Sequence, residues 1–290
     1  MTRISVSKTY KMYINGAYVR SERAYVGAQH MPNGTLIAHY PTASRKDLRD
    51  AVSAARKAQS GWAKRAAFNR SQILFRIAEM LETRRAGFEA NLTAWLGYTK
   101  PIAKAELDTA IDAVFWYAGW ADKYTQVLGS INPVAAPFFN YSVPEPTGVV
   151  VQFVPASSPV AGLLRAVCIG IVTGNTVVVI ADNIAPLIAL DLAEVLGVSD
   201  VPAGVVNLLT GNRKELLKPA AQHMDVNAIG YWGDDAEDRK VAQEAAAGNM
   251  KRLYLGDDAG AESWRSTEPL TLYDLLPFVE FKTVWHPVGV

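Results

Sequence analysis

The stretch GVVVQFVPASSPVAGLLRAVCIGIVTGNTVVVIA, residues 148–181, decides the fold of this chain. Two short and continuously apolar runs, 148–155 and 175–181, lie on either side of a segment with a helical pattern at about 159–172. Runs of this kind are typical of parallel strands that are buried on both faces of a sheet. Strand, helix and strand at this spacing predict a βαβ unit.

The same alternation continues toward the C-terminus. A second helical pattern, about 186–197, precedes a third apolar run, GVVNLLTG at 204–211. A strand at about 226–231 and a helix near 234–248 are expected next, and KRLYL at 251–255 follows them. The chain is therefore predicted to be an α/β protein with a Rossmann-like parallel sheet.

Two local signals organise the N-terminal part. Residues 12–20 (MYINGAYVR) predict a hairpin, because β-prone runs flank Asn15-Gly16, a pair that accepts a type I′ turn. Ser44 with Asp47 indicates the start of a helix, since the serine can cap it and the acid stands near the positive end of its dipole.

Two long helices and a ribbon are expected before residue 148. The helices are placed at about 68–96 and 103–128, and the aromatic residues of the second are typical of core or subunit contact. Between 134 and 146, prolines punctuate PFFNYSV, and proline is tolerated at strand ends and edges. This stretch therefore predicts a projecting ribbon or an edge strand.

Composition excludes several classes of protein. The 29 basic and 28 acidic side chains give a net charge of +1, and no basic run indicates nucleic-acid binding. The single cysteine, Cys168, excludes an internal disulfide and is typical of a reducing compartment. The most apolar stretch, 161–181, is broken by Arg165 and by the polar residues 173–175, so no membrane span is expected. Without a signal-peptide pattern, a soluble, cytoplasmic protein is expected.

Several segments are similar, in order and spacing, to the aldehyde dehydrogenase superfamily. They are YINGAYV (13–19), SRKDLRDAVSAARKAQSGW (44–62), PAGVVNLLTG (202–211) and FVEFKTVWHP (278–287). PAGVVNLLTG is a fairly specific signature, and the collinear match covers nearly the whole chain. The resemblance implies an α/β cofactor domain, a separate catalytic domain and a ribbon used in oligomerisation.

The chain departs from the family pattern in one large respect. Only about two dozen residues separate KRLYL from the C-terminal strand, fewer than the roughly 50 that a domain needs. The resemblance thus implies that the catalytic domain is missing while the tail is kept. The expected parts are N-terminal hairpins and helices of the cofactor domain at 1–133, an oligomerisation ribbon at 134–147, a Rossmann-like part at 148–256, a linker replacing the catalytic domain at 257–277, and an oligomerisation strand at 278–290.

The family's catalytic residues are not found. Its reaction uses a cysteine thiolate, an asparagine that stabilises the oxyanion, and a glutamate base. Cys168 lies in an apolar helical segment and is expected to be a buried small hydrophobe rather than the nucleophile. Ser157 stands at the position of the asparagine and Gly256 at that of the glutamate. Asp257 or Asp258 replaces the base only by a shifted alignment, and both resemble loop residues.

The family's cofactor contacts are also altered. Ile180 and Asn183 stand where a lysine and a glutamate bind the adenosine ribose, and Trp232 stands near the pyrophosphate position. Asp234 and Asp235 would repel a pyrophosphate, or cap the helix that normally binds it. NAD binding is expected to be weak or absent, so no cofactor is expected, and the four histidines have no metal spacing. The vestigial cofactor positions are Pro155, Ser157, Ile180, Asn183, Gly211, Trp232, Gly233 and Asp234.

These observations favour a noncatalytic member of the family, similar to the nonfunctional second half of its doubled-domain members. Such a pseudoenzyme would act as an oligomerising or accessory subunit, either as a homo-oligomer or as a hetero-oligomer with a full-length aldehyde dehydrogenase. The alternative is an NAD(P)-dependent aldehyde oxidoreductase that is active only with a partner subunit. A third hypothesis, a small-molecule sensor using the vestigial cleft, has no positive support in the sequence.

Overall fold

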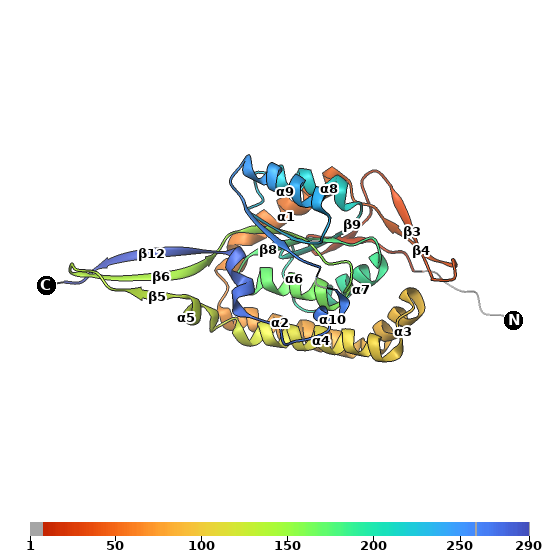
Figure 1. The fold of residues 1–290 in the computed structure, drawn as a ribbon, viewed down its shortest axis with the longest axis horizontal. Helices are drawn as coiled ribbons and strands as arrows, with labels where there is room; N and C mark the ends of the chain where they lie inside the picture. Colours follow the sequence, from red (N-terminus) through yellow and green to blue (C-terminus); the bar gives the residue numbers. More distant parts are fainter. Residues whose placement is uncertain (1–7, 259, 290) are drawn as a thin grey trace.

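A seven-stranded sheet forms the centre of the computed structural model, which describes residues 8–258 and 260–289 (Figure 1). The strand order is β11-β10-β7-β8-β9-β1-β2. The five strands from β11 to β9 are parallel to one another, whereas β1 is antiparallel to both of its neighbours, β9 and β2. The predicted Rossmann-like α/β fold is confirmed. The strands are β1 (Met12–Ile14), β2 (Ala17–Val19), β7 (Val149–Phe153), β8 (Thr176–Ala181), β9 (Val206–Thr210), β10 (Ala228–Trp232) and β11 (Arg252–Gly256).

Helices cover both faces of the sheet (Figure 1). The side chains of β8 alternate between two cores, because successive residues of a strand point to opposite faces. Val177 and Val179 belong to one core, and Val178 and Ile180 belong to the other. The helices are α1 (Arg45–Ala63), α8 (Arg213–Gln222) and α9 (Ala236–Ala247) on one face, and α6 (Ala161–Ile171), α7 (Pro186–Gly197) and the helices outside them on the other.

Both N-terminal signals are confirmed. Asn15 and Gly16 have φ angles of 54° and 74°, as a type I′ turn requires between β1 and β2. The Ser44 side chain accepts hydrogen bonds from the backbone of Lys46 and Asp47, and Asp47 accepts one from the backbone of Ser44. This capping box begins α1 one residue after Ser44.

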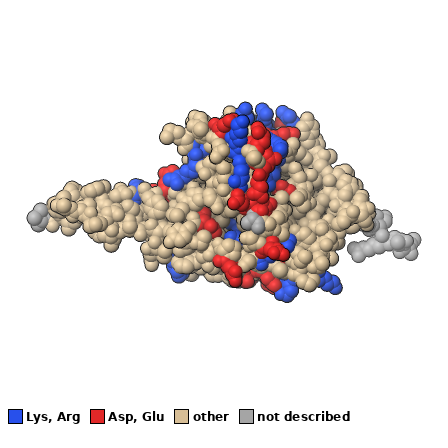
Figure 2. Space-filling view, viewed as in Figure 1, with Lys and Arg blue, Asp and Glu red and all other residues tan. Residues whose placement is uncertain are grey.

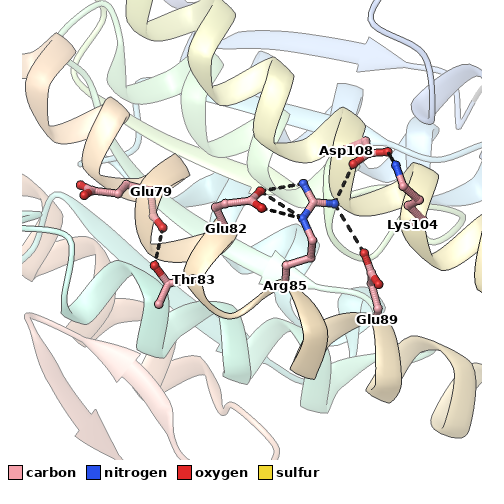
Figure 3. A network of polar contacts seen from close by, with 7 residues as sticks. All are labelled: Glu79, Glu82, Thr83, Arg85, Glu89, Lys104 and Asp108. Atoms are coloured by element: carbon pink, nitrogen blue, oxygen red, sulfur yellow. Dashed lines mark hydrogen bonds and ion pairs between the residues drawn. The ribbon is translucent and has the colours of Figure 1, made fainter.

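The two long helices expected from sequence are each divided. The segment 68–96 contains α2 (Ala67–Thr83) and α3 (Arg85–Leu96), and the chain leaves helical geometry at Arg84. In Figure 3, Arg85 donates to Glu82 and Asp108, so one guanidinium ties the end of α2 and the start of α3 to α4. The segment 103–128 likewise contains α4 (Lys100–Trp120) and α5 (Tyr124–Leu128).

Helix α8 was not expected from the sequence. Asn212 caps it by accepting a hydrogen bond from Lys214 N, and Leu216 and Leu217 are buried. Pro219 lies inside the helix and cannot donate a backbone hydrogen bond, which weakens the helical signal.

A three-stranded antiparallel ribbon projects from the body of the molecule (Figure 1). It consists of β5 (Ser130–Asn132), β6 (Phe138–Pro146) and β12 (Val279–Pro287). The predicted ribbon is confirmed, with β6 as its central strand rather than an edge. A separate hairpin pairs β3 (Val26–His30) with β4 (Leu36–Pro41).

The segment that the sequence predicted to be a linker, 257–277, is largely folded. It contains α10 (Ala261–Trp264) and most of a 3₁₀ helix, η1 (Leu272–Phe278). Trp264, Leu275 and Phe278 are buried in the main core. We call residues 260–278 the plug, because their buried aromatic side chains pack against Trp232 of β10 and Tyr254 of β11. No helix in the described part of the chain is long and apolar enough to cross a membrane.

Candidate cofactor site

The carboxyl ends of β7, β8 and β10 meet at one edge of the sheet, where open α/β sheets bind their ligands. The structure places most of the sequence-predicted positions in the loops at or beside this edge. Ile180 is an exception, because its side chain is fully buried in the core beneath α1. Asn183 is exposed in the loop after β8.

Asp258, which follows β11, lies against the loop that follows β7. Its carboxylate accepts hydrogen bonds from the backbone of Ala156 at 3.0 Å and of Ser157 at 3.2 Å. It also accepts from the Ser157 hydroxyl, and from the indole of Trp264 at 3.1 Å. Ser157 therefore donates its hydroxyl to the chain's own carboxylate and not toward a substrate. The Asp258 carboxylate thus accepts hydrogen bonds from four donors of the chain itself, whereas a general base needs a carboxylate oxygen that is free to accept a proton.

A second carboxylate occupies the N-terminus of α6. Glu106 projects from α4 and is fully buried. Its Oε1 accepts from the Ser158 hydroxyl at 2.6 Å and from the backbone of Val160 and Ala161 at 3.0 and 3.1 Å. Its Oε2 accepts from Arg265 of the plug at 3.0 Å. The backbone donors of α6 are thus already bound to an anion.

A third carboxylate, Asp235, caps α9. It accepts from the backbone of Glu237 and Asp238 at 3.0 Å each and pairs with Lys214 at 3.0 Å. These interactions, the backbone N–H of Asp238 foremost, hold the pKa of Asp235 below its ordinary value. The adjacent Asp234 accepts from Asp258 N at 3.2 Å. Of the two capping candidates in the sequence, Asp235 is the one that caps.

Arg213 spans the ends of three strands. Its Nη1 donates to Val154 O after β7 at 2.7 Å and to Asp182 after β8 at 3.0 Å. Its Nη2 donates to Trp232 O at 3.3 Å, at the end of β10. A cation at this edge would attract an anionic ligand. The Arg213 guanidinium, however, already donates its hydrogen bonds to Asp182 and to two backbone carbonyls.

Aromatic side chains fill the remaining space. Trp232 donates to Gln152 at 3.0 Å and packs against Tyr254 and Trp264, with ring centres 4.9 and 5.4 Å away. A Cβ at Gly256 would lie 2.4 Å from the Trp232 ring, so the family's glutamate does not fit here without repacking. The cavity beside Pro155 has a volume of about 10 Å³, room for roughly one water.

The sole thiol is not a nucleophile in this fold. Cys168 is fully buried in α6, and this burial raises the pKa of its thiol far above its ordinary range. A buried, protonated thiol is unreactive. Within 8–258 and 260–289, no group of His, Cys, Asp and Glu side chains has the arrangement of a metal site.

Sequence reasoning missed Glu106, Arg213 and the role of Asp258. Glu106 carried a signal, because it stands among apolar residues that helical spacing places on a buried face of α4. The other two carried none, since their partners come from distant segments.

Fold and site together define a Rossmann-like α/β domain in which the chain's own side chains bind the backbone donors at the carboxyl edge of the sheet. Residues 18–259 match the model of the aldehyde dehydrogenase family. The chain belongs to the aldehyde dehydrogenase family.

Two curated relatives are aldehyde dehydrogenases by name and match most of this chain. D-glyceraldehyde dehydrogenase (NADP(+)) of Thermoplasma acidophilum is 31% identical over 261 residues, which cover 89% of this chain and 52% of that protein. The putative aldehyde dehydrogenase DhaS of Bacillus subtilis is 31% identical over 253 residues, covering 85% of this chain and 50% of that protein. The chain therefore spans about half the length of the curated relatives it matches.

A solved structure, that of PnpE from Pseudomonas sp. WBC-3, superposes with a TM-score of 0.80 at 28% identity. The superposition covers 86% of this chain and 50% of PnpE. The likeness thus covers most of this chain but only half of the solved one.

Proposed function

We propose that this chain is a noncatalytic member of the aldehyde dehydrogenase family and acts as an oligomerising or accessory subunit. The observation that carries the proposal is the occupation of the ligand edge by the chain itself. Glu106, Asp235 and Asp258 bind the backbone donors there, and the plug with Trp232 fills the space between them.

Each loss bears on a different step of the family's chemistry. The pyrophosphate of a dinucleotide needs free N–H groups at a helix N-terminus, and the first turn of α9 already donates to Asp235. The ribose would meet no side chain of Ile180, which points into the core. An aldehyde would meet no thiolate, because Cys168 is buried.

The first prediction concerns the cofactor. Titration calorimetry of the full chain with NAD is expected to give no binding heat, and an aldehyde panel is expected to give no NADH absorbance. Saturable NAD binding would contradict the occupied ligand edge on which the proposal depends, and NADH formation by the chain alone would contradict the noncatalytic role. NADH formation that appears only when this chain is mixed with a full-length aldehyde dehydrogenase that keeps its catalytic cysteine but has an inactivated NAD site would favour the alternative, an oxidoreductase completed by a partner.

The ribbon is the surface that supports association. Phe139, Phe281 and Trp285 are 46%, 48% and 58% exposed, and Ile131 is 73% exposed. The face of the ribbon seen in Figure 2 carries few charged side chains beyond its base. The outer edge of β12 has no neighbouring strand among the described residues. Exposed apolar edges of this kind pair with other chains.

The second prediction tests this association. The double variant Phe139→Ser, Trp285→Ser is expected to dissociate at concentrations at which the unaltered chain is oligomeric, as measured by light scattering. Phe68→Ser on α2 is the matched control, since Phe68 is 65% exposed but lies outside the ribbon. The unaltered chain should also be mixed with a full-length aldehyde dehydrogenase. A monomer in both settings would contradict the proposed role.

A further inference from the structure

A pocket outside the ligand edge lies between the N-terminal segment, β2, the α2–α3 junction and α7. It has a volume of about 340 Å³. A second hollow of about 260 Å³ adjoins it between α3 and α7, and the two share Arg84 and Glu194. Cavities of this size hold small organic ligands.

Arg84 is the unusual residue of this wall. It stands where the chain turns from α2 into α3, and its Nη1 is buried with no hydrogen-bond partner among the described residues. The nearby carboxylates of Asp191 and Glu194 both pair with Lys8 rather than with Arg84. The Lys8 Nζ lies 2.8 Å from Glu194 Oε1. Nη1 itself has almost no accessible surface, so a ligand in the pocket would contact the accessible remainder of the Arg84 side chain, whose charge pairs with no carboxylate in the described part of the chain.

The rest of the wall suits an anion that carries an apolar body. Lys11 adds a second positive charge, while Tyr10, Tyr18, Leu190 and Val198 supply aromatic and aliphatic surface. A guanidinium binds a carboxylate through two parallel hydrogen bonds, which fixes the orientation of the ligand.

We propose that this pocket binds a small carboxylic acid with an aromatic or branched apolar body. The carboxylate pairs with Arg84, and the body packs between Tyr10, Tyr18 and Leu190. The site shares no residue with the filled ligand edge, so it operates whether or not the chain binds NAD.

Benzoate is the probe, and inorganic phosphate is the bare anion for comparison. Titration calorimetry on the full chain is expected to show saturable benzoate binding, with phosphate at least tenfold weaker because it lacks an apolar body. Arg84→Gln is expected to weaken benzoate binding at least tenfold. Arg76→Gln is the matched control on α2, because Arg76 is exposed and pairs with Glu79; its affinity for benzoate should be unchanged.

A second measurement separates binding from folding. Without ligand, Arg84→Met is expected to melt at or above the temperature of the unaltered chain, since it removes a buried donor that has no acceptor. Absence of saturable benzoate binding, equal affinity in Arg84→Gln, or phosphate binding as tight as benzoate would each overturn the proposal. Because the site is separate, a failure here leaves the proposed noncatalytic role standing, and the reverse also holds.

Discussion

Replacing Glu106 by alanine is expected to lower the free energy of unfolding by about 3–5 kcal/mol, the usual cost of breaking a buried ion pair from one side. The change strips Ser158, Val160 and Ala161 of their shared acceptor. It also leaves Arg265, whose side chain is only 14% exposed, without its carboxylate. Urea denaturation followed by circular dichroism measures the loss.

A matched control distinguishes this effect from a general loss of acid. Glu79 lies on α2 and pairs with Arg76, but its side chain is 62% exposed, so Glu79→Ala should change stability by less than about 0.5 kcal/mol. Arg265→Met removes the other partner and should cost less than Glu106→Ala, because Oε1 of Glu106 keeps three donors. If Glu106→Ala costs under about 1 kcal/mol, Glu106 does not anchor the plug.

The stretch 148–181 was sufficient to predict the first βαβ unit, because its two buried parallel strands leave short apolar runs on either side of a segment with helical spacing. The break at Arg84 was not predictable in the same way. Arginine is a good helix former, and apolar spacing continues past it. The break depends on contacts of Arg85 with α4, which lie 23 residues away in sequence.

In the candidate site too, contacts between sequence neighbours were predictable and contacts between distant segments were not. The cap at Asp235 was predictable because a helix cap and its donors are neighbours in sequence. The other two carboxylates were not, since Glu106 and Ser158 are 52 residues apart and Ser157 and Asp258 are 101 apart. Sequence alone predicted that the family's catalytic residues are absent from this chain. It could not show that other side chains have taken the donors that remained.

Replacing Trp264 by alanine is expected to cost about 3–5 kcal/mol and to open the plug. Trp264 is 4% exposed, its ring packs edge-on against Trp232, and the guanidinium of Arg165 lies 4.7 Å from its centre. Its removal leaves Trp232 open to solvent, so tryptophan fluorescence should shift to the red as stability falls in urea. Trp264→Phe is the control, because it keeps an aromatic ring beside Trp232 and loses the hydrogen bond to Asp258 together with a smaller part of the packing.

The same variant separates the two ways in which we propose that the chain excludes a dinucleotide. The plug blocks space, whereas Asp235 blocks the backbone donors of α9. Opening the plug leaves that cap in place, so Trp264→Ala is expected to remain unable to bind NAD in titration calorimetry. Adding Asp234→Gly and Asp235→Ser removes both carboxylates from the helix N-terminus and keeps a capping hydroxyl. NAD binding by Trp264→Ala alone would show that the plug is the only barrier. Binding that appears only in the triple variant would show that the caps also exclude the cofactor.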